Sequence, residues 1–259
     1  MKRTVVVFAA LLLTFLMADA RTVKKNYEID DFTGIRATSA FDVVLEHSDE
    51  FNVEINISEE FLPFLVVKNR GGVLELSFTR LPFRLKQKNR NKVVQAIISM
   101  PELNYIALSG ASDLSSNDQF TTANSRFVID LKGGSSISNL NVKAPDVDIR
   151  LAGASKAVIS LRSSDVKAEL SGASRLEVTG DAAEFDIKAS GASRVYASDF
   201  ETDDIAVKAA GASTVEVRPA RQLTVDLSGA SKCRYFGDDD NVKVHTERVT
   251  GASSVKRDK

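Results

Sequence analysis

The sequence is poor in the residues that most often build metal and redox sites, with one cysteine and two histidines in 259 residues. The single cysteine, Cys233, excludes a disulfide within the chain, and we interpret it as a small core hydrophobe rather than a reactive thiol. No zinc-like cysteine and histidine spacing, phosphate-binding loop or dinucleotide-binding glycine motif is present. We therefore expect no cofactor and no metal.

Two weaker signals for chemistry remain, and each has a plainer interpretation. A Ser-His-Asp triad through His47 or His245 is disfavoured, because the many serines and aspartates of this chain make chance pairings easy. The run Asp238 to Asp240 offers oxygen ligands of the kind calcium prefers, but a polar hairpin tip after Gly237 is favoured. We expect no catalytic residue, and no enzyme.

Only one long hydrophobic run occurs, and it lies at the N-terminus. Val5 to Met17 is apolar apart from Thr14, follows a basic start and precedes Ala18-Asp19-Ala20. This pattern is typical of a secretory signal peptide, here residues 1–20. Because no later run could span a membrane, we expect an exported protein without an integral membrane segment, in the periplasm, at the cell surface or secreted.

The net charge argues against one class of partner. It is −1 for the whole chain and becomes −2 once Lys2, Arg3 and Asp19 are removed with the signal peptide. A slightly acidic chain lacks the broad positive surface that nucleic-acid binding requires. We expect no nucleic-acid partner.

What the chain does contain is a tandem repeat. Gly-Ala-Ser recurs seven times in the C-terminal half, and one Gly-Gly-Ser fills the gap between the first two copies. Successive glycines lie 18 to 23 positions apart, a period that indicates a stacked solenoid. The repeat glycines are Gly110, Gly133, Gly153, Gly172, Gly191, Gly211, Gly229 and Gly251.

Both segments that flank each Gly-Ala-Ser alternate with a period of two. The positions six, four and two before the glycine are mostly apolar, and so is the second position after the serine. Strands without intervening helices predict a parallel β-helix with coils of about 20 residues, an all-β fold. We expect it to be right-handed, as parallel crossovers usually are. The apolar positions after the serines are Leu114, Ile137, Ala157, Leu176, Val195, Val215, Cys233 and Val255.

Charges three positions before each repeat glycine, from the second copy onward, support this stacking. Their sign alternates at every step but one, and in a parallel stack such residues lie about 4.8 Å apart, where opposite charges attract. The ladder comprises Asp130, Arg150, Glu169, Lys188, Lys208, Asp226 and Arg248.

The Gly-Ala-Ser element itself suits a tight corner between two strands. Glycine permits backbone angles that a Cβ forbids, alanine is expected to stack in an inner column, and serine is expected to bond the local backbone. A serine row that binds a ligand directly is the less favoured alternative.

Residues 21–105 lack the repeat and predict a β-rich cap, while residues 106–259 form the repeat β-helix. Strands are expected at 27–29, 35–37, 41–46, 51–57, 65–68 and 73–78, with a hairpin turn at 69–72. Ser58 predicts the N-cap of a single helical turn before Pro63, and the basic tract 80–92 predicts a solvated loop. A solenoid end needs such a cover because an open coil exposes unpaired strand edges; irregular first coils are the alternative to a separate cap.

The last coil, 244–255, breaks the apolar pattern. Counting back from Gly251 puts His245 and Glu247 at inward positions. Polar residues there suit a terminal, half-exposed coil.

Several phrases together resemble a known family. They are Asp31-Phe32-Thr33-Gly34-Ile35, Phe41 to Leu45, Met100-Pro101-Glu102-Leu103, the Gly-Ala-Ser series and Tyr235-Phe236-Gly237. From about Asp31 to Val255 the chain resembles the auto-transporter adhesin head domains of the GIN type. The resemblance implies a β-helical envelope or secreted protein of a Gram-negative bacterium, and supplies no catalytic or ligand residue.

One outward column after the serines is a candidate binding site. Lys156, Arg175 and Arg194 occupy the same place in three adjacent coils, where like charges are mildly unfavourable. Glu177 and Glu216 lie two positions further along and are expected to neutralise part of the column. A solvated face is one interpretation, and contact with an acidic glycan or other anion is another.

These patterns favour a noncatalytic binding or structural module. The leading hypothesis is an adhesin-like protein that recognises an acidic glycan or an envelope protein through an exposed strand face. A polysaccharide lyase or hydrolase is the second hypothesis and would require paired carboxylates, or arginine plus carboxylate, in a cleft. A structural envelope protein that self-associates is the third.

Overall fold

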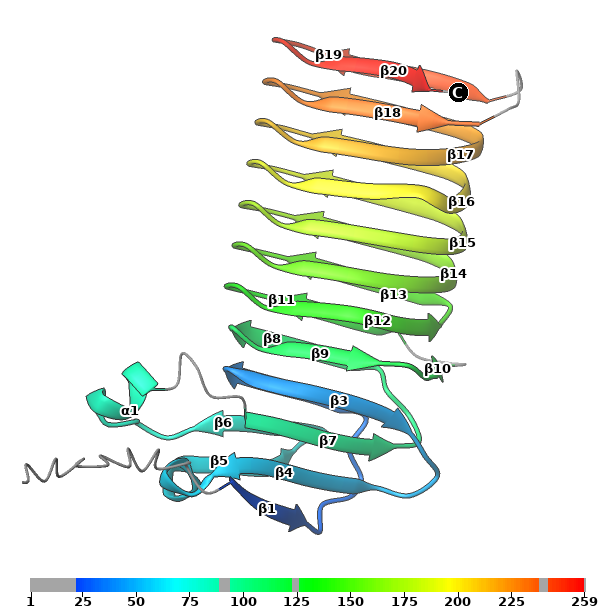
Figure 1. Ribbon diagram of the computed structural model, residues 1–259. Coiled ribbons are helices and arrows are strands. Elements are labelled where there is room, and N and C mark those ends of the chain that lie inside the picture. Colours follow the sequence, from blue (N-terminus) through cyan, green and yellow to red (C-terminus); the bar gives the residue numbers. More distant parts are fainter. Residues whose placement is uncertain (1–21, 89–93, 123–125, 238–241, 259) are drawn as a thin grey trace, which may run out of the picture.

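The computed structural model describes residues 22–88, 94–122, 126–237 and 242–258. The chain forms a β-solenoid whose coils stack along one axis, with the N-terminal elements at one end and β20 at the other (Figure 1). Each coil of the repeat has a leading strand, before the glycine, and a trailing strand, after the serine. The strands of the repeat are β8 (Tyr105–Gly110), β9 (Asp113–Ser116), β10 (Gln119–Thr121), β11 (Phe127–Leu131), β12 (Ser136–Lys143), β13 (Asp146–Leu151), β14 (Lys156–Leu170), β15 (Arg175–Ala189), β16 (Arg194–Ala209), β17 (Thr214–Leu227), β18 (Lys232–Phe236), β19 (Lys243–Val249) and β20 (Ser254–Asp258).

Neighbouring coils pair in parallel, as the repeat predicts. β14 and β15 pair along their whole length, from Lys156 opposite Arg175 to Leu170 opposite Ala189. The charge ladder is in register across all six of its steps, from Asp130 opposite Arg150 to Asp226 opposite Arg248. The predicted parallel β-solenoid is therefore confirmed.

Alternation sends the apolar residues of both strands into one core. The positions two, four and six before the corner glycines of the central coils are buried, as Phe185, Ile187 and Ala189 illustrate. Val195 and Cys233 represent the trailing strands, and neither is exposed at all. Because the two strands of a coil face each other across this core, their outward faces lie on opposite sides of the solenoid. We call these surfaces the leading face and the trailing face.

The corner glycines are required by the close approach of successive coils. Gly191 has a φ of +75°, and a Cβ on it would lie 2.6 Å from the carbonyl oxygen of Gly172. That oxygen accepts a hydrogen bond of 2.7 Å from the backbone N–H of Ala192, which holds the corners together. A side chain at this position would therefore meet both backbone strain and a steric clash.

The roles predicted for the other two corner residues are half right. The prediction of an inner alanine column is wrong, since Ala173 and Ala192 are exposed. The serines point inward instead, and the hydroxyl of Ser193 donates to the carbonyl of Ser190 at 2.7 Å. The predicted bond to the local backbone is thus confirmed, and burial argues against direct ligand contact. Seven corner serines are buried and make the same bond three residues back, at 2.7 to 3.2 Å: Ser112, Ser135, Ser155, Ser174, Ser193, Ser213 and Ser231.

Gly134 stands where the other seven copies of the repeat have alanine, and the structure does not require glycine there. Its φ is not positive, and a Cβ on it would lie 3.7 Å from the nearest atom, the Gly110 oxygen. We expect Gly134→Ala to raise the free energy of unfolding by about 0.4–1 kcal/mol, because alanine restricts the unfolded chain. Urea denaturation measures this. Gly133→Ala is the matched control and should destabilise, since Gly133 has a φ of +77° and its Cβ would lie 2.8 Å from the same oxygen.

The N-terminal elements continue the stack and then close it. They are β1 (Thr22–Tyr27), β2 (Gly34–Ser39), β3 (Phe41–His47), β4 (Asn52–Ser58), the 3₁₀ helix η1 (Glu59–Phe64), β5 (Leu65–Arg70), β6 (Val73–Phe78), α1 (Phe83–Lys88) and β7 (Val94–Met100). β2 and β3 pair in parallel with β8 and β9 above them and with β6 and β7 below. β4 pairs antiparallel with β1 and β7, and β5 with β6, so the direction of pairing changes at this end. The division of the chain near residue 105 stays a prediction.

Local predictions for this segment were partly wrong. The strand expected at 27–29 ends at Tyr27, and β7 was not predicted. The tract expected to be a loop contains α1, which buries Leu85, and Leu81, two residues before the helix, is buried as well. A helical turn does begin after Ser58 at the N-cap position, as predicted, but Ser58 makes no side-chain capping bond and η1 continues through Pro63. The hairpin turn between β5 and β6 is confirmed.

The last coil corrects another expectation. The register between β17 and β19 shifts after Val225, so that Leu223 faces Val244 and Leu227 faces Val249. His245 lies opposite the outward residue Thr224, and neither it nor Glu247, which falls at the shift, is inward. The prediction of polar inward residues is wrong because one extra residue in β19 reverses the alternation. Every residue of β19 is exposed.

Candidate functional site

The three cations expected to share a column do so on the trailing face. Lys156 lies opposite Arg175, and Arg175 lies opposite Arg194, each as the first residue of its strand. The side chains of Lys156 and Arg175 are 49% and 44% exposed, so the column is open to solvent. Parallel pairing places the backbones of these three residues about 4.8 Å apart, the distance between strands.

Glu177 neutralises part of the column. Its carboxylate oxygen Oε1 lies 3.2 Å from Nζ of Lys156 and 2.7 Å from Nε of Arg175, so two cations share a single carboxylate. Partial burial raises the pKa of Glu177, but hydrogen bonds from the two cations outweigh this effect and the pKa is lowered. Glu216 instead binds Arg234. Within the described residues, Arg194 forms no ion pair, and the column keeps an excess of positive charge.

An aromatic ring lies beside the column, which sequence analysis did not single out. The guanidinium of Arg175 lies over the ring of Tyr196, 4.4 Å from its centroid. Tyr196 is half-buried and pairs with Glu177 and Glu216 in the neighbouring coils. Its position two residues after Arg194, on the same face, is the signal that could have revealed it.

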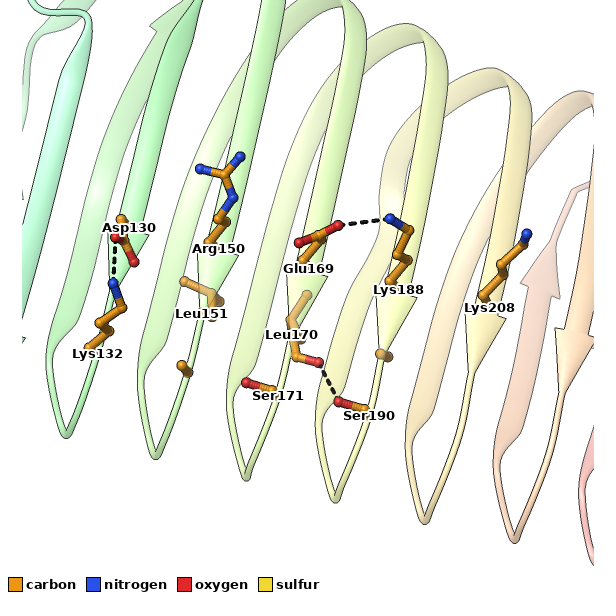
Figure 2. A pocket seen from close by; sticks show the side chains of 12 residues that line it. Asp130, Lys132, Arg150, Leu151, Glu169, Leu170, Ser171, Lys188, Ser190 and Lys208 are labelled. Carbon is orange, nitrogen blue, oxygen red and sulfur yellow. Dashed lines mark hydrogen bonds and ion pairs between the residues drawn. The ribbon is translucent and has the colours of Figure 1, made fainter.

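A groove of about 520 Å³ lies on the opposite side of the molecule, on the leading face. Figure 2 shows the charged ladder residues Arg150, Glu169, Lys188 and Lys208 along it, with smaller side chains nearer the corners. Those small side chains are Ala152, Ser171 and Ser190, while Lys132 and Asp130 lie at one end and bind each other at 2.8 Å. Sequence analysis noted the ladder but missed the groove, which the small residues next to it create.

The carboxylates of the groove are held in ion pairs. Glu169 accepts a hydrogen bond from Lys188 at 2.8 Å, and this bond is the main reason that its pKa is lowered and the pKa of Lys188 is raised. A general acid for glycoside cleavage requires a raised pKa. Glu169 therefore suits charge pairing rather than proton donation.

Another carboxylate pair lies at the start of the trailing face. Asp42 on β3 is opposite Asp113 on β9, and the hydroxyl of Ser136 donates to Asp113. Burial, and then the charge of Asp113, raises the pKa of Asp42. Neither residue lines the groove of Figure 2.

The other residues singled out for chemistry do not assemble into a site. Cys233 is buried, and burial raises the pKa of its thiol to about 12, which suits a core residue. His47 binds Asp118 through its backbone N–H, at 2.8 Å, and not through its ring. Among the described residues no group of metal-ligating side chains is present, and Asp238 to Asp240 lie outside them.

The fold and the repeat match a known family. A model described as "Putative auto-transporter adhesin, head GIN domain" matches residues 31–238. The chain belongs to this family. No curated protein matches the sequence.

Solved structures share the fold. A "putative adhesin" from Parabacteroides distasonis superposes with a TM-score of 0.80 at 18% identity, covering 92% of this chain and 98% of its own. A "putative adhesin" from Parabacteroides merdae gives 0.80 at 18%, with 93% and 98% covered. A "putative lipid binding protein" from Parabacteroides distasonis gives 0.78 at 16%, with 93% and 98% covered. At these identities the likeness shows the fold alone.

The expected signal peptide, residues 1–20, lies outside the described residues. In the described part of the chain, no helix has the length and apolarity needed to cross a membrane.

Proposed function

We propose that the protein is a noncatalytic, adhesin-like module that recognises an acidic glycan through its trailing face. One observation carries the proposal: Lys156, Arg175 and Arg194 stack in one column, and the first two share a single carboxylate while Arg194 has none in the described chain. Like charges stacked at strand spacing are unfavourable, and a bound anion would relieve that repulsion.

The repeat itself suits a polymeric ligand. Because three adjacent coils present their cations from backbone positions about 4.8 Å apart, a linear chain with regularly spaced anionic groups meets several cations at once. Arginine also binds carboxylate and sulfate-like groups through two parallel hydrogen bonds. The half-buried ring of Tyr196 adds an apolar surface beside these charges.

The relatives support a binding module at the cell envelope. Two of the similar structures are called adhesins and one is called a lipid-binding protein, and all three names describe binding rather than catalysis. The N-terminal pattern of residues 1–20 favours export as well. We infer that the module acts outside the cytoplasm, in the periplasm or on the cell surface.

A glycan-array screen of the protein from Arg21 onward tests this function. We expect binding to acidic but not neutral glycans, and weaker binding at raised salt because these charges are exposed. Changing Lys156, Arg175 and Arg194 to serine should weaken binding at least tenfold, since each charge-assisted bond contributes about 1.5–3 kcal/mol.

A matched control removes the same charge elsewhere. Lys25, Lys68 and Arg84 are exposed cations of the N-terminal segment, and changing all three to serine should leave binding unchanged. If both triple variants weaken binding equally, only net charge matters and the column is not the site. If the protein binds no acidic glycan, the proposal is wrong.

The other hypotheses receive less support. Arg150 and Glu169 both line the groove, which is the arginine and carboxylate that a lyase would require, but Glu169 is held in an ion pair with Lys188. A hydrolase would need a carboxylate with a raised pKa in a cleft, whereas the pKa of Glu169 is lowered and Asp42 and Asp113 lie outside the groove. A self-associating structural protein would bury the exposed strands β19 and β20, which analytical ultracentrifugation would reveal as a dimer or polymer.

A further inference from the structure

The alternation of the charge ladder breaks at one place, inside the groove. Lys188 lies directly opposite Lys208 in the next coil. Glu169 pairs with Lys188, and Asp226, the other neighbour of Lys208, is held by two hydrogen bonds from Arg248, both of 2.9 Å. In the described ranges of the chain, Lys208 consequently has no ion pair. Of these two adjacent ammonium groups, only that of Lys188 is paired with a carboxylate.

The rest of the groove offers both donors and acceptors of hydrogen bonds. Ser190 donates its hydroxyl proton to the Leu170 carbonyl at 3.2 Å, which leaves the oxygen free to accept (Figure 2). Ser171 is exposed, and Glu169 presents a second carboxylate oxygen to the groove. At about 520 Å³ the groove has the size of a small-ligand site.

We propose that this groove is a second anion site, which takes an acidic sugar. Its carboxylate lies between the ammonium groups of Lys188 and Lys208, and its hydroxyls bond Glu169 and Ser171. A hydroxyl-bearing anion uses these donors and acceptors together.

The two sites would make the module bivalent. The groove is on the leading face and the basic column is on the trailing face, so the two point away from each other across the core. One molecule therefore bridges two acidic glycan chains. This bridging rests on the proposed function of the trailing face, whereas binding in the groove does not.

Calorimetric titration with trigalacturonic acid counts the sites, and uncharged galactotriose is the ligand control. The native protein should bind two molecules of the acid per chain. Lys188→Gln with Lys208→Gln should leave one site, the triple serine variant of the column should leave the other, and the combined variant should leave none. Lys167→Gln with Lys243→Gln, two exposed lysines outside the groove, is the matched control and should keep both sites.

Bridging is measured with beads coated in polygalacturonate, after light scattering has established that the protein is a monomer. The native protein and the control should aggregate the beads, and neither single-site variant should, although each still binds them. If the variant with Lys188→Gln and Lys208→Gln still binds two molecules of the acid and aggregates the beads as well as the native protein does, the proposed groove site is wrong.

Failure of the two proposals can be told apart. One site that only the groove variant removes would support the groove and overturn the proposed trailing-face function. One site that only the column variant removes would overturn the groove alone. No binding of the acid by the native protein would overturn both.

Discussion

Replacing Gly180 by alanine is expected to lower the free energy of unfolding by about 3 kcal/mol or more, the upper range for strained backbone. Gly180 has a φ of +112°, outside the conformations that residues with a Cβ adopt easily. A Cβ there would also press into the carbonyl oxygen of Leu161 in the coil below, far inside van der Waals contact. Since that oxygen belongs to the backbone, no side-chain rotation relieves the clash. Equilibrium denaturation in urea measures the loss.

Gly71→Ala separates the two causes. Gly71 has a φ of +59°, but nothing lies within 4 Å of its Cβ position, so only the backbone strain of about 1–2 kcal/mol applies. If Gly180→Ala lowers the free energy of unfolding no more than Gly71→Ala does, the coils separate easily at Gly180, and close stacking does not require glycine there.

Phe200→Ala should destabilise the protein by about 3–5 kcal/mol, the usual cost of removing a buried phenylalanine ring. Phe200 is completely buried and packs edge to face against Phe185, with ring centroids 5.3 Å apart. In a solenoid each coil contacts only its neighbours, so the cavity weakens both interfaces of one coil. Thermal and urea unfolding both report this loss.

Phe83→Ala is the control for ring removal. Phe83 lies in α1 with 77% of its surface exposed, and its change should alter stability by no more than about 0.5 kcal/mol. A cost below about 2 kcal/mol for Phe200→Ala would show that the neighbouring coils collapse into the space, contrary to our expectation.

The corner shows what alternation predicts when it is applied fully. Serine precedes the first inward residue of each trailing strand by two positions, as Ser193 precedes Val195. With a period of two, this spacing already puts the serine inside and the alanine outside. An inner alanine column follows only if the small size of alanine is considered alone, and the strand geometry overrides that preference.

Two other differences could not be foreseen from spacing. The extra residue in β19 reverses which side chains face inward, and only pairing with β17 reveals where it falls. β7 pairs with β3 on one side and β4 on the other, and both of these strands are distant from β7 in the sequence. Strand preference depends on such neighbours more than on the residues of the strand itself.

The candidate sites were likewise predictable only in part from the sequence. Equal spacing from the serines was enough to stack Lys156, Arg175 and Arg194, because a repeat places equivalent residues in one column. Spacing could not tell that Glu177 turns toward the first two and leaves Arg194 unpaired, since ion pairs depend on the direction of long side chains. The groove on the leading face also required the structure.

The sequence by itself determined the all-β solenoid, its coil length, its inward apolar rows and the vertical order of its charges. These features follow from two short-range regularities, the period of two within a strand and the period of about twenty between coils, and both are visible in one dimension. Tertiary structure alone decided how the N-terminal strands close the stack, where the last coil shifts register and which charges remain unpaired. Those outcomes depend on contacts between side chains and strands whose separation in the sequence follows no fixed period.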